Sequence, residues 1–329
     1  MKKTLLITAG VLTTSAILLT ETVNASAQKT INIGVLQVVQ HGSLDAARNG
    51  FEKELTKEVK AYNSNWTVKY NYQNAQGDQA NLQSMSSQIV KGKPDLILAI
   101  AKPSAQTIAK TTKSIPILTT AVTDLKRAGL VKDNNKPATN VSGTSDLTPV
   151  DKQLKLLSTL TKSEKPLGVI YNSSEENSTL QVDMAKKYAK EHHLKLKIVS
   201  VTSTNDIQSA LNSIDGQIAG LYVPSDNLMA SAMHTIGRVT QKAKLPVVTG
   251  SIEMAEDGGT ATYGLNYQDL GKQTAKMAAQ IILDHKDVKQ MPVEQSDKLH
   301  LYVNKSNLKK SVLKPVTSRN LNLGGSQLC

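Results

Sequence analysis

Residues 94–111, which read PDLILAIAKPSAQTIAKT, decide the fold because they contain one complete strand–loop–helix unit. Residues 95–101 are predicted to form a strand, and a helix is predicted over 104–111 with Pro103 at its start. Units of this kind assemble into parallel sheets, with the connecting helices covering both faces. The question is then how often the unit recurs along the chain.

The strand–helix alternation occurs in two sets. The first set has predicted strands at 31–39, 66–72, 95–101 and 115–122 and helices at 45–59, 79–90 and 104–111. The second set has strands at 167–171, 196–201, 218–223 and 245–249 and helices at 179–192, 206–214 and 228–241. This pattern predicts an α/β protein with two Rossmann-like lobes. The carboxyl ends of both sets of strands can face a ligand cleft between the lobes.

Composition limits the functional classes. The chain has 329 residues, enough for about two domains, and 39% of them are hydrophobic. A single Trp and a single Phe indicate aliphatic cores. The formal charge of +12 can favour nucleic acid or an anionic surface. The lysines are scattered and the aromatic residues form no stacking array, so we expect solvated surface charge and no nucleic-acid partner.

The N-terminus has the pattern of a secretory signal peptide. Met1-Lys2-Lys3 is followed by an apolar stretch over 5–20 and by Ala25-Ser26-Ala27, a cleavage motif of the A-x-A type. We expect cleavage after Ala27 and an exported protein that is extracellular or on the outer face of the membrane. No second apolar run of about 18 residues occurs, so the mature chain is not expected to span a membrane. The only cysteine is Cys329, so no disulfide within the chain is expected.

The lobes are expected to exchange segments of chain. We assign 1–27 to the signal peptide, 28–144 plus 266–291 to lobe 1, 145–265 plus 292–314 to lobe 2, and 315–329 to a disordered tail. The chain is expected to cross between lobes near 141–148 and 260–267, before helices at 150–160 and 268–283. A final strand is predicted at 299–303. A few crossings of this kind act as a hinge for rigid-body rotation.

Polar residues cluster where predicted strands end. The candidate ligand-binding residues are His41, Lys102, Ser104, Ala105, Gln106, Thr123, Asp124, Ser145, Asn172, Ser174, Glu175, Asn177, Ser178, Asp226, Asn227, Gly250, Ser251 and Tyr263. Each cluster taken alone also suits helix capping, and a tyrosine there also suits sheet packing. The helix start at Ser104 favours an anionic group, and the carboxylates of Asp124 and Asp226 favour an ammonium. Together they suit a zwitterion, that is, a free amino acid.

An enzymatic function finds no support in the motifs. The chain has no nucleophile elbow, P-loop, dinucleotide fingerprint or zinc-protease motif. His192-His193 lies at a predicted helix end and lacks metal-ligand spacing. His41 is expected to shape or hydrogen-bond a ligand. We therefore predict no catalysis, no metal and no cofactor.

A resemblance to a known family rests on seven stretches in order. They are Ile33-Gly34-Val35 with His41 and Leu44-Asp45, 94–101, 121–124, Tyr171-Asn172-Ser173-Ser174-Glu175 with Asn177-Ser178, 223–227, 261–264, and Tyr267 with Asp269-Leu270-Gly271. The chain resembles the ABC-transporter substrate-binding proteins of the tryptophan/tyrosine type. The resemblance implies a type I periplasmic-binding-protein fold. It also implies a monomer that captures an aromatic amino acid by lobe closure and delivers it to an ABC transporter permease.

The sequence leaves open two departures from the family pattern and three other functions. No lipobox cysteine follows the apolar stretch, and Lys102 stands where the family has a small Thr or Ser. Lys102 can pair with a ligand carboxylate or fill the pocket. The chain can also be a sensor that presents its closed form to a membrane receptor, or a binder of another small polar solute. A secreted enzyme is the least favoured function.

Overall fold

The computed structural model describes residues 28–161, 163–296 and 298–311. The predicted signal peptide, its cleavage site, Cys329 and the predicted tail at 315–329 lie outside the described residues. Within the described segments, no helix is long and apolar enough to cross a membrane.

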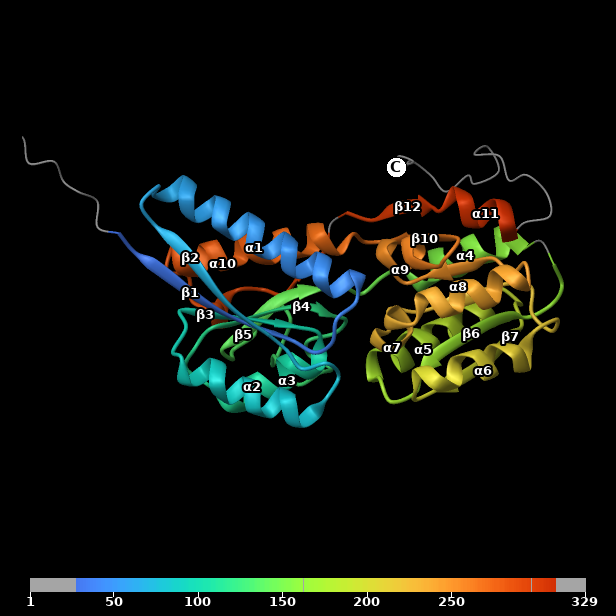
Figure 1. The fold of residues 1–329 in the computed structure, drawn as a ribbon, viewed down its shortest axis with the longest axis horizontal. Helices are drawn as coiled ribbons and strands as arrows, with labels where there is room; N and C mark the ends of the chain where they lie inside the picture. The colour runs from blue at the N-terminus through green and yellow to red at the C-terminus, as the bar shows by residue number, and fades with distance from the viewer. Residues whose placement is uncertain (1–27, 162, 297, 312–329) are drawn as a thin grey trace, which may run out of the picture.

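Two six-stranded sheets form the centres of two lobes, in the α/β arrangement expected from the sequence (Figure 1). The first sheet has the order β11-β5-β4-β3-β1-β2, and the second has the order β12-β10-β9-β8-β6-β7. All neighbours are parallel except β10 and β12. The strands are β1 Thr30–Gln37, β2 Thr67–Asn74, β3 Leu96–Ile100, β4 Ile117–Val122, β5 Val141–Ser145, β6 Leu167–Asn172, β7 Leu196–Val201, β8 Leu221–Val223, β9 Val247–Thr249, β10 Ala261–Gly264, β11 Glu294–Gln295 and β12 His300–Val303.

Helices cover both faces of each sheet. They are α1 Gly42–Tyr62, α2 Gln79–Lys91, α3 Lys102–Thr111, α4 Val150–Thr161, α5 Glu176–Glu191, α6 Ile207–Ile214, α7 Asn227–Ser231, α8 Met233–Lys242, α9 Ile252–Asp257, α10 Tyr267–Ile282 and α11 Lys305–Ser311, with short 3-10 turns η1 Thr204–Asp206 and η2 Val288–Gln290. In the first lobe α1 and α10 lie on one face and α2 and α3 on the other (Figure 1). In the second lobe the apolar core is divided by the sheet, with α4 and α5 on one side and α6 and α8 on the other.

The crossings between lobes differ from those expected. Residues 141–148 were expected to be a crossover, but β5 is a strand that pairs with β4. Ser145 therefore belongs to the first lobe. Residues 292–314 were expected to lie in the second lobe, but β11 pairs with β5 in the first sheet. Both strands are short, so backbone pairing rather than a hydrophobic pattern determines where they belong. The predicted helix at 228–241 is also divided, at Ala232, into α7 and α8.

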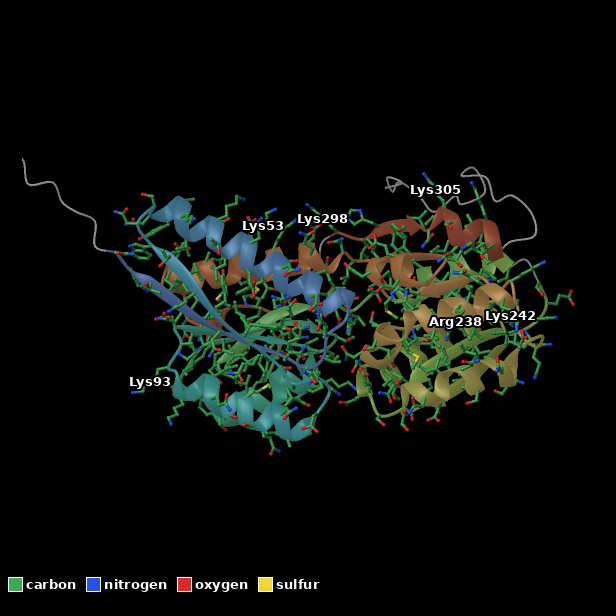
Figure 2. The ribbon with its side chains drawn as sticks, viewed as in Figure 1. Lys53, Lys93, Arg238, Lys242, Lys298 and Lys305 are labelled. Atoms are coloured by element: carbon green, nitrogen blue, oxygen red, sulfur yellow. The ribbon has the colours of Figure 1, made fainter. Side chains whose placement is uncertain are left out.

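The surface charge lies on both lobes, as the scattered lysines suggested. Figure 2 shows Lys53 and Lys93 on the first lobe and Arg238 and Lys242 on the second. All four side chains are exposed. The positive charge is therefore not confined to one lobe.

Two glycines bring the backbones of α1 and α10 into direct contact. A Cβ on Gly271 would lie 1.9 Å from the carbonyl oxygen of Ala47, and one on Gly50 would lie 2.1 Å from that of Gln268. Both distances are too short for any carbon–oxygen contact. The absence of these side chains is therefore what lets the two helices pack at this distance.

Substitution of Gly271 by Ala should destabilise the protein, although alanine is the better helix former. Helix propensity alone favours alanine by about 0.5–1 kcal/mol, whereas overpacking against a backbone atom costs about 1–3 kcal/mol. We expect urea denaturation to show a net loss of unfolding free energy. Lys276→Ala on the exposed side of α10 is the control, expected to change it by less than about 0.5 kcal/mol. An equal or higher stability of Gly271→Ala would contradict the close packing.

Candidate functional site

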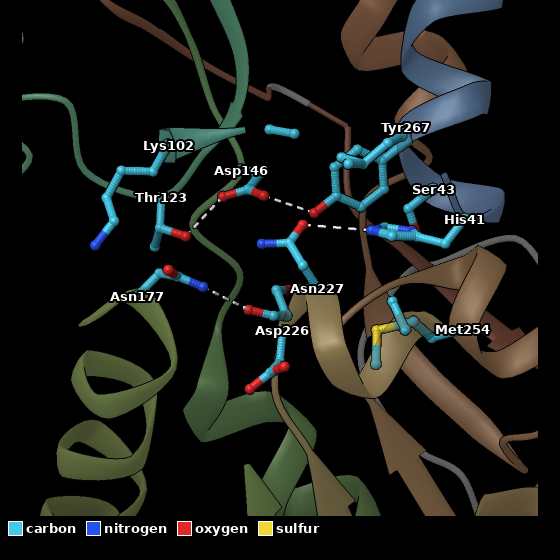
Figure 3. Close-up of a pocket in the computed structure, with 14 residues that line it drawn as sticks. His41, Ser43, Lys102, Thr123, Asp146, Asn177, Asp226, Asn227, Met254 and Tyr267 are labelled. Atoms are coloured by element: carbon cyan, nitrogen blue, oxygen red, sulfur yellow. Dashed lines mark hydrogen bonds between the residues drawn. The ribbon is translucent and has the colours of Figure 1, made fainter. Parts of the chain in front are cut away.

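A cavity lies between the lobes, where strand ends of both sheets meet (Figure 3). Its lining residues are His41, Ser43, Leu44, Lys102, Ala121, Thr123, Asp146, Asn177, Ser225, Asp226, Asn227, Ala230, Met254 and Tyr267. The enclosed volume is about 20 Å³, which is room for about one water molecule. An organic ligand can therefore enter only when the lobes separate or the lining side chains move.

Strained backbone turns shape the wall formed by the first lobe. Ala101 directly follows β3, and its φ is 71°. Ala121 is the last residue but one of the neighbouring strand β4, and its φ is 58°. Residues other than glycine rarely adopt such values, which concentrate at binding and active sites. These turns place Lys102 and Thr123 at the cavity.

A buried carboxylate occupies the hinge side of the cavity. One oxygen of Asp146 accepts a hydrogen bond from Thr123 Oγ1 at 2.9 Å, and the other accepts one from the Tyr267 hydroxyl at 2.6 Å. Burial raises the pKa of Asp146, and these two hydrogen bonds oppose the rise. Each carboxylate oxygen can accept a second hydrogen bond. Asp146 is thus a buried hydrogen-bond acceptor that is held in a fixed position.

On the second lobe, Glu175 organises the wall. Its carboxylate accepts hydrogen bonds from Asn227 Nδ2 at 2.7 Å, Asn177 Nδ2 at 3.2 Å and the backbone N–H of Leu228 at 3.2 Å. It therefore joins the loop after β6 to the start of α7. With this many donors already bound, Glu175 is suited to hold the loop rather than to contact a ligand.

Asp226 has the same structural character. Its two oxygens accept the backbone N–H groups of Asn172 at 2.6 Å and Met229 at 2.9 Å, so it caps α7 and fixes the end of β6. Burial and the nearby charge of Glu175 raise the pKa of Asp226 to about 7. The geometry favours the capping role over an ion pair with a ligand ammonium.

Several contacts join the lobes directly across the cleft. His41 Nε2 lies 3.3 Å from Asn227 Oδ1, and the hydroxyls of Ser43 and Ser251 are 3.2 Å apart. Burial lowers the pKa of His41, which favours the neutral ring. Within the part of the chain that the structure describes, His41 Nδ1 and Ser225 Oγ are buried without a hydrogen-bond partner. Both residues line the cavity, so these atoms are suited to bind a polar ligand.

An ionic latch closes the mouth of the cleft. Glu176, at the start of α5, lies 3.2 Å from Lys102 Nζ and 3.1 Å from Arg127 Nε of the first lobe. The hydrogen bonds from Arg127 and Lys102 hold the pKa of Glu176 below its usual value. The Glu176 side chain is 47% exposed, so salt should weaken this latch.

The candidate residues from the sequence fall into three groups. Those that line the cavity are His41, Lys102, Thr123, Asn177, Asp226 and Asn227. Asp124 lies at the mouth, beside Arg127 and Glu176. The remaining candidates do not line the cavity: Ser104, Ala105, Gln106, Ser145, Asn172, Ser174, Glu175, Ser178, Gly250, Ser251 and Tyr263.

Several of those remaining candidates have identifiable structural contacts. Gln106 donates to the carbonyl of Ala128 at 2.9 Å, and Ser145 donates to the carbonyl of Thr123 at 2.7 Å. Ser251 caps α9 through the N–H of Met254. The ring of Tyr263 lies under the ammonium group of Lys152, 4.8 Å from its centre. The side chains of Gln106, Ser145 and Ser251 thus hold loops and a helix start.

The structure adds residues that were not among the candidates. They are Ser43, Leu44, Ala121, Asp146, Ser225, Ala230, Met254 and Tyr267. Asp146 follows a candidate directly, and Tyr267 lies in a stretch shared with the resembled family, so a signal existed for both. Leu44, Ala230 and Met254 are apolar helix residues, which the sequence alone cannot distinguish from core. Among the described residues, no group of three His, Cys, Asp or Glu side chains could hold a metal.

The sequence is similar to those of known substrate-binding proteins. The sequence profile of a family described as ABC transporter substrate binding protein matches residues 32–316. A tyrosine-binding protein of Clostridioides difficile is 40% identical over 301 residues, which cover 92% of this chain and 86% of that protein.

Two solved structures are similar at comparable identity. An ABC domain from Streptococcus pneumonia in complex with L-Trp is 35% identical, with a TM-score of 0.79 over 86% of this chain and 94% of that chain. A ligand-free, open substrate-binding protein from Clostridium difficile is 41% identical, with a TM-score of 0.69 over 91% and 99%. The contacts that cross the cleft correspond to a closed arrangement of the lobes.

Replacement of Glu253 by Gln should change how stability depends on pH. Glu253 accepts the N–H of Tyr267 at 2.8 Å, and burial raises its pKa to about 7. The folded state thus keeps a proton that the unfolded state loses near pH 4.5, so stability falls as the pH rises from about 4.5 to about 7. We expect the unfolding free energy of Glu253→Gln, relative to the wild type, to rise by about 2–3 kcal/mol between pH 5 and 8.

Chemical denaturation at several pH values would measure this difference. Glu191→Gln, in an exposed position, is the control and should follow the wild type throughout. A constant difference between Glu253→Gln and wild type across the range would show that Glu253 does not carry the proton.

Glu176→Gln should weaken lobe closure and its dependence on salt. The variant loses both ion pairs to the first lobe, and each exposed pair contributes about 0.2–1 kcal/mol. Small-angle X-ray scattering of the wild type should show a larger radius of gyration at about 500 mM salt than at about 50 mM, because salt screens the pairs. The variant should be as expanded as the high-salt wild type in both conditions. Glu191→Gln on the same helix should behave as the wild type, and a variant that still responds to salt would contradict the latch.

Proposed function

The chain belongs to the family of ABC transporter substrate-binding proteins, and from this premise we propose that it captures an aromatic amino acid in the cleft and delivers it to a permease. The family is non-enzymatic and extracytoplasmic. Export through the predicted signal peptide and the permease as partner are parts of the proposal. Solved structures of lower identity share the type I periplasmic-binding-protein fold.

The observation that carries the proposal is a pair of opposite charges on one cavity. The Asp146 carboxylate lies on the hinge side, and the Lys102 ammonium lies at the mouth. A free amino acid has both complementary groups, so its ammonium suits Asp146 and its carboxylate suits Lys102. To bind the ligand, Lys102 exchanges part of its contact with Glu176 for a contact with that carboxylate.

Support for an aromatic side chain comes from the remaining walls. Leu44 and Met254 are apolar, and Tyr267 and the neutral ring of His41 are flat. Aromatic rings pack well on both kinds of surface, and sulfur–aromatic contacts add about 0.3–1.5 kcal/mol. The names of the relatives, a tyrosine-binding protein and a complex with L-Trp, point to the same ligand class.

Closure gives the mechanism of capture. A ligand seated on Asp146 and Tyr267 gains contacts from Asn177, Ser225 and Met254 only when the second lobe closes. Its affinity for the closed form then exceeds that for the open form, and this difference shifts the population toward closure. The closed surface is the form that a transport partner can recognise.

Titration calorimetry with L-Trp, L-Tyr and L-Phe tests the proposal. We expect at least one to bind, and Asp146→Asn to weaken binding by about 2–5 kcal/mol, the cost of removing a buried charged partner. Asp124→Asn, at the mouth, should keep the affinity within about threefold. The wild type should prefer L-Trp to tryptamine, which lacks the carboxylate, and Lys102→Met should lose that preference. If none of the three amino acids gives a heat of binding while a sugar or nucleoside does, the proposed class of ligand is wrong.

A further inference from the structure

A second concave surface lies on the second lobe and shares no lining residue with the cleft cavity. It is a groove of about 530 Å³ between α8, the end of α9 and α11. We call it the α8–α11 groove and define it by its lining residues His234, Gly237, Arg238, Gln241, Lys242, Asp257, Gly258 and Lys310. The groove is widely open to solvent, unlike the enclosed pockets that bind small molecules.

The floor of the groove is backbone, because two glycines meet there. A Cβ on Gly258 would lie 2.1 Å from the carbonyl oxygen of Met233, and one on Gly237 would lie 2.8 Å from the Cα of Gly258. Gln241 Nε2 also donates to Asn307 Oδ1 at 3.0 Å, which ties α8 to α11. The walls are therefore held by packed secondary structure and not by a mobile loop.

The walls carry a strong excess of positive charge. Arg238, Lys242 and Lys310 are all exposed, and Figure 2 shows Arg238 and Lys242 next to each other on this lobe. No ion pair among the described residues involves any of the three. Asp257 is the carboxylate in the lining, so three cations face one anion.

Asp257 is directed toward the other lobe. A Cβ on Gly42, the first residue of α1, would lie 3.1 Å from Asp257 Oδ2. The residue before it, His41, makes no side-chain cap for α1. The carboxylate of Asp257 thus lies at the uncapped positive end of a helix in the first lobe, where negative charge is favourable. With the lobes closed, the negative charge of Asp257 interacts with the N-terminus of α1, so it opposes an anion in the groove less strongly.

We propose that the α8–α11 groove binds an acidic peptide segment of a protein partner, and that it does so most strongly when the lobes are closed. The planar guanidinium of Arg238 matches a carboxylate in two hydrogen bonds, and the two lysines add charge along the groove. Separation of the lobes removes the α1 terminus from Asp257 and leaves that charge to oppose the peptide. The proposal goes beyond amino-acid capture and does not require it.

Other occupants fit less well. Residues 312–329 of this chain contain Lys314 and Arg319 and no acidic residue, so they cannot neutralise the groove. A uniformly charged phosphate polymer would meet the Asp257 carboxylate at one end. A peptide with spaced carboxylates avoids this repulsion and can use the side-chain amide of Gln241.

Fluorescence anisotropy with a labelled octamer of glutamate tests the groove on the full protein. We expect binding that weakens with salt, and at least a tenfold loss in the double variant Arg238→Ala/Lys242→Ala. The matched control is Lys53→Ala/Lys60→Ala, which removes the same charge from exposed positions on α1 and should stay within about twofold. Circular dichroism checks that both variants are folded.

Three results would overturn the proposal. Equal losses in the two double variants would mean that only net charge matters. Absence of peptide binding, or a variant-sensitive preference for labelled polyphosphate over the peptide, would exclude an acidic peptide as the occupant. For closure, Asp257→Asn should raise peptide affinity most in Glu176→Gln, whose lobes are more open, and an equal effect in both backgrounds would refute the coupling. None of these measurements uses the amino-acid ligand, so their failure is distinct from failure of the proposed function.

Discussion

The backbone contact between α1 and α10 is the constraint on which the cleft depends. Gly50 and Gly271 let the two helices approach until each backbone touches the other. The starts of these helices form one wall of the cavity: His41, Ser43 and Leu44 lie at the start of α1, and Tyr267 opens α10. A shift of either helix would therefore move the ring of Tyr267 relative to Ser43. It would also move the Tyr267 hydroxyl relative to Asp146, which accepts its hydrogen bond.

Closure of the lobes rests on few contacts of different kinds. The contact of His41 with Asn227 is part-buried and neutral, whereas the latch at Glu176 is half exposed and ionic. The first kind is insensitive to salt and the second is not. Neither is strong enough to prevent opening, since a hydrogen bond contributes about 0.5–1.5 kcal/mol and an exposed ion pair about 0–1 kcal/mol. Such a balance suits a protein that must both close on a ligand and release it.

Much of the fold could be predicted from the sequence, because strands such as β3 are apolar runs followed by a helical pattern, here with Pro103 in the first turn of α3. The lobe boundaries could not. β5 reads Val-Ser-Gly-Thr-Ser and β11 has two residues, so neither shows a hydrophobic period, and only pairing across the sheet defines them. For the site, strand ends located the cleft but not the role of each side chain. Asp226 is a cap and Asp146 a buried acceptor, a difference that depends on which backbone N–H groups lie nearby.

The exchange of segments between lobes also has a consequence for how the chain is made. The first sheet is incomplete until β11, and its covering helix α10 comes after the whole of β6–β10. The second sheet in turn needs β12, which follows both. During synthesis neither lobe can therefore finish its core before about residue 300, and such long-range pairing is intrinsically slow to form. A chain whose two sheets are both completed only near residue 300 therefore has unfinished cores for most of its synthesis.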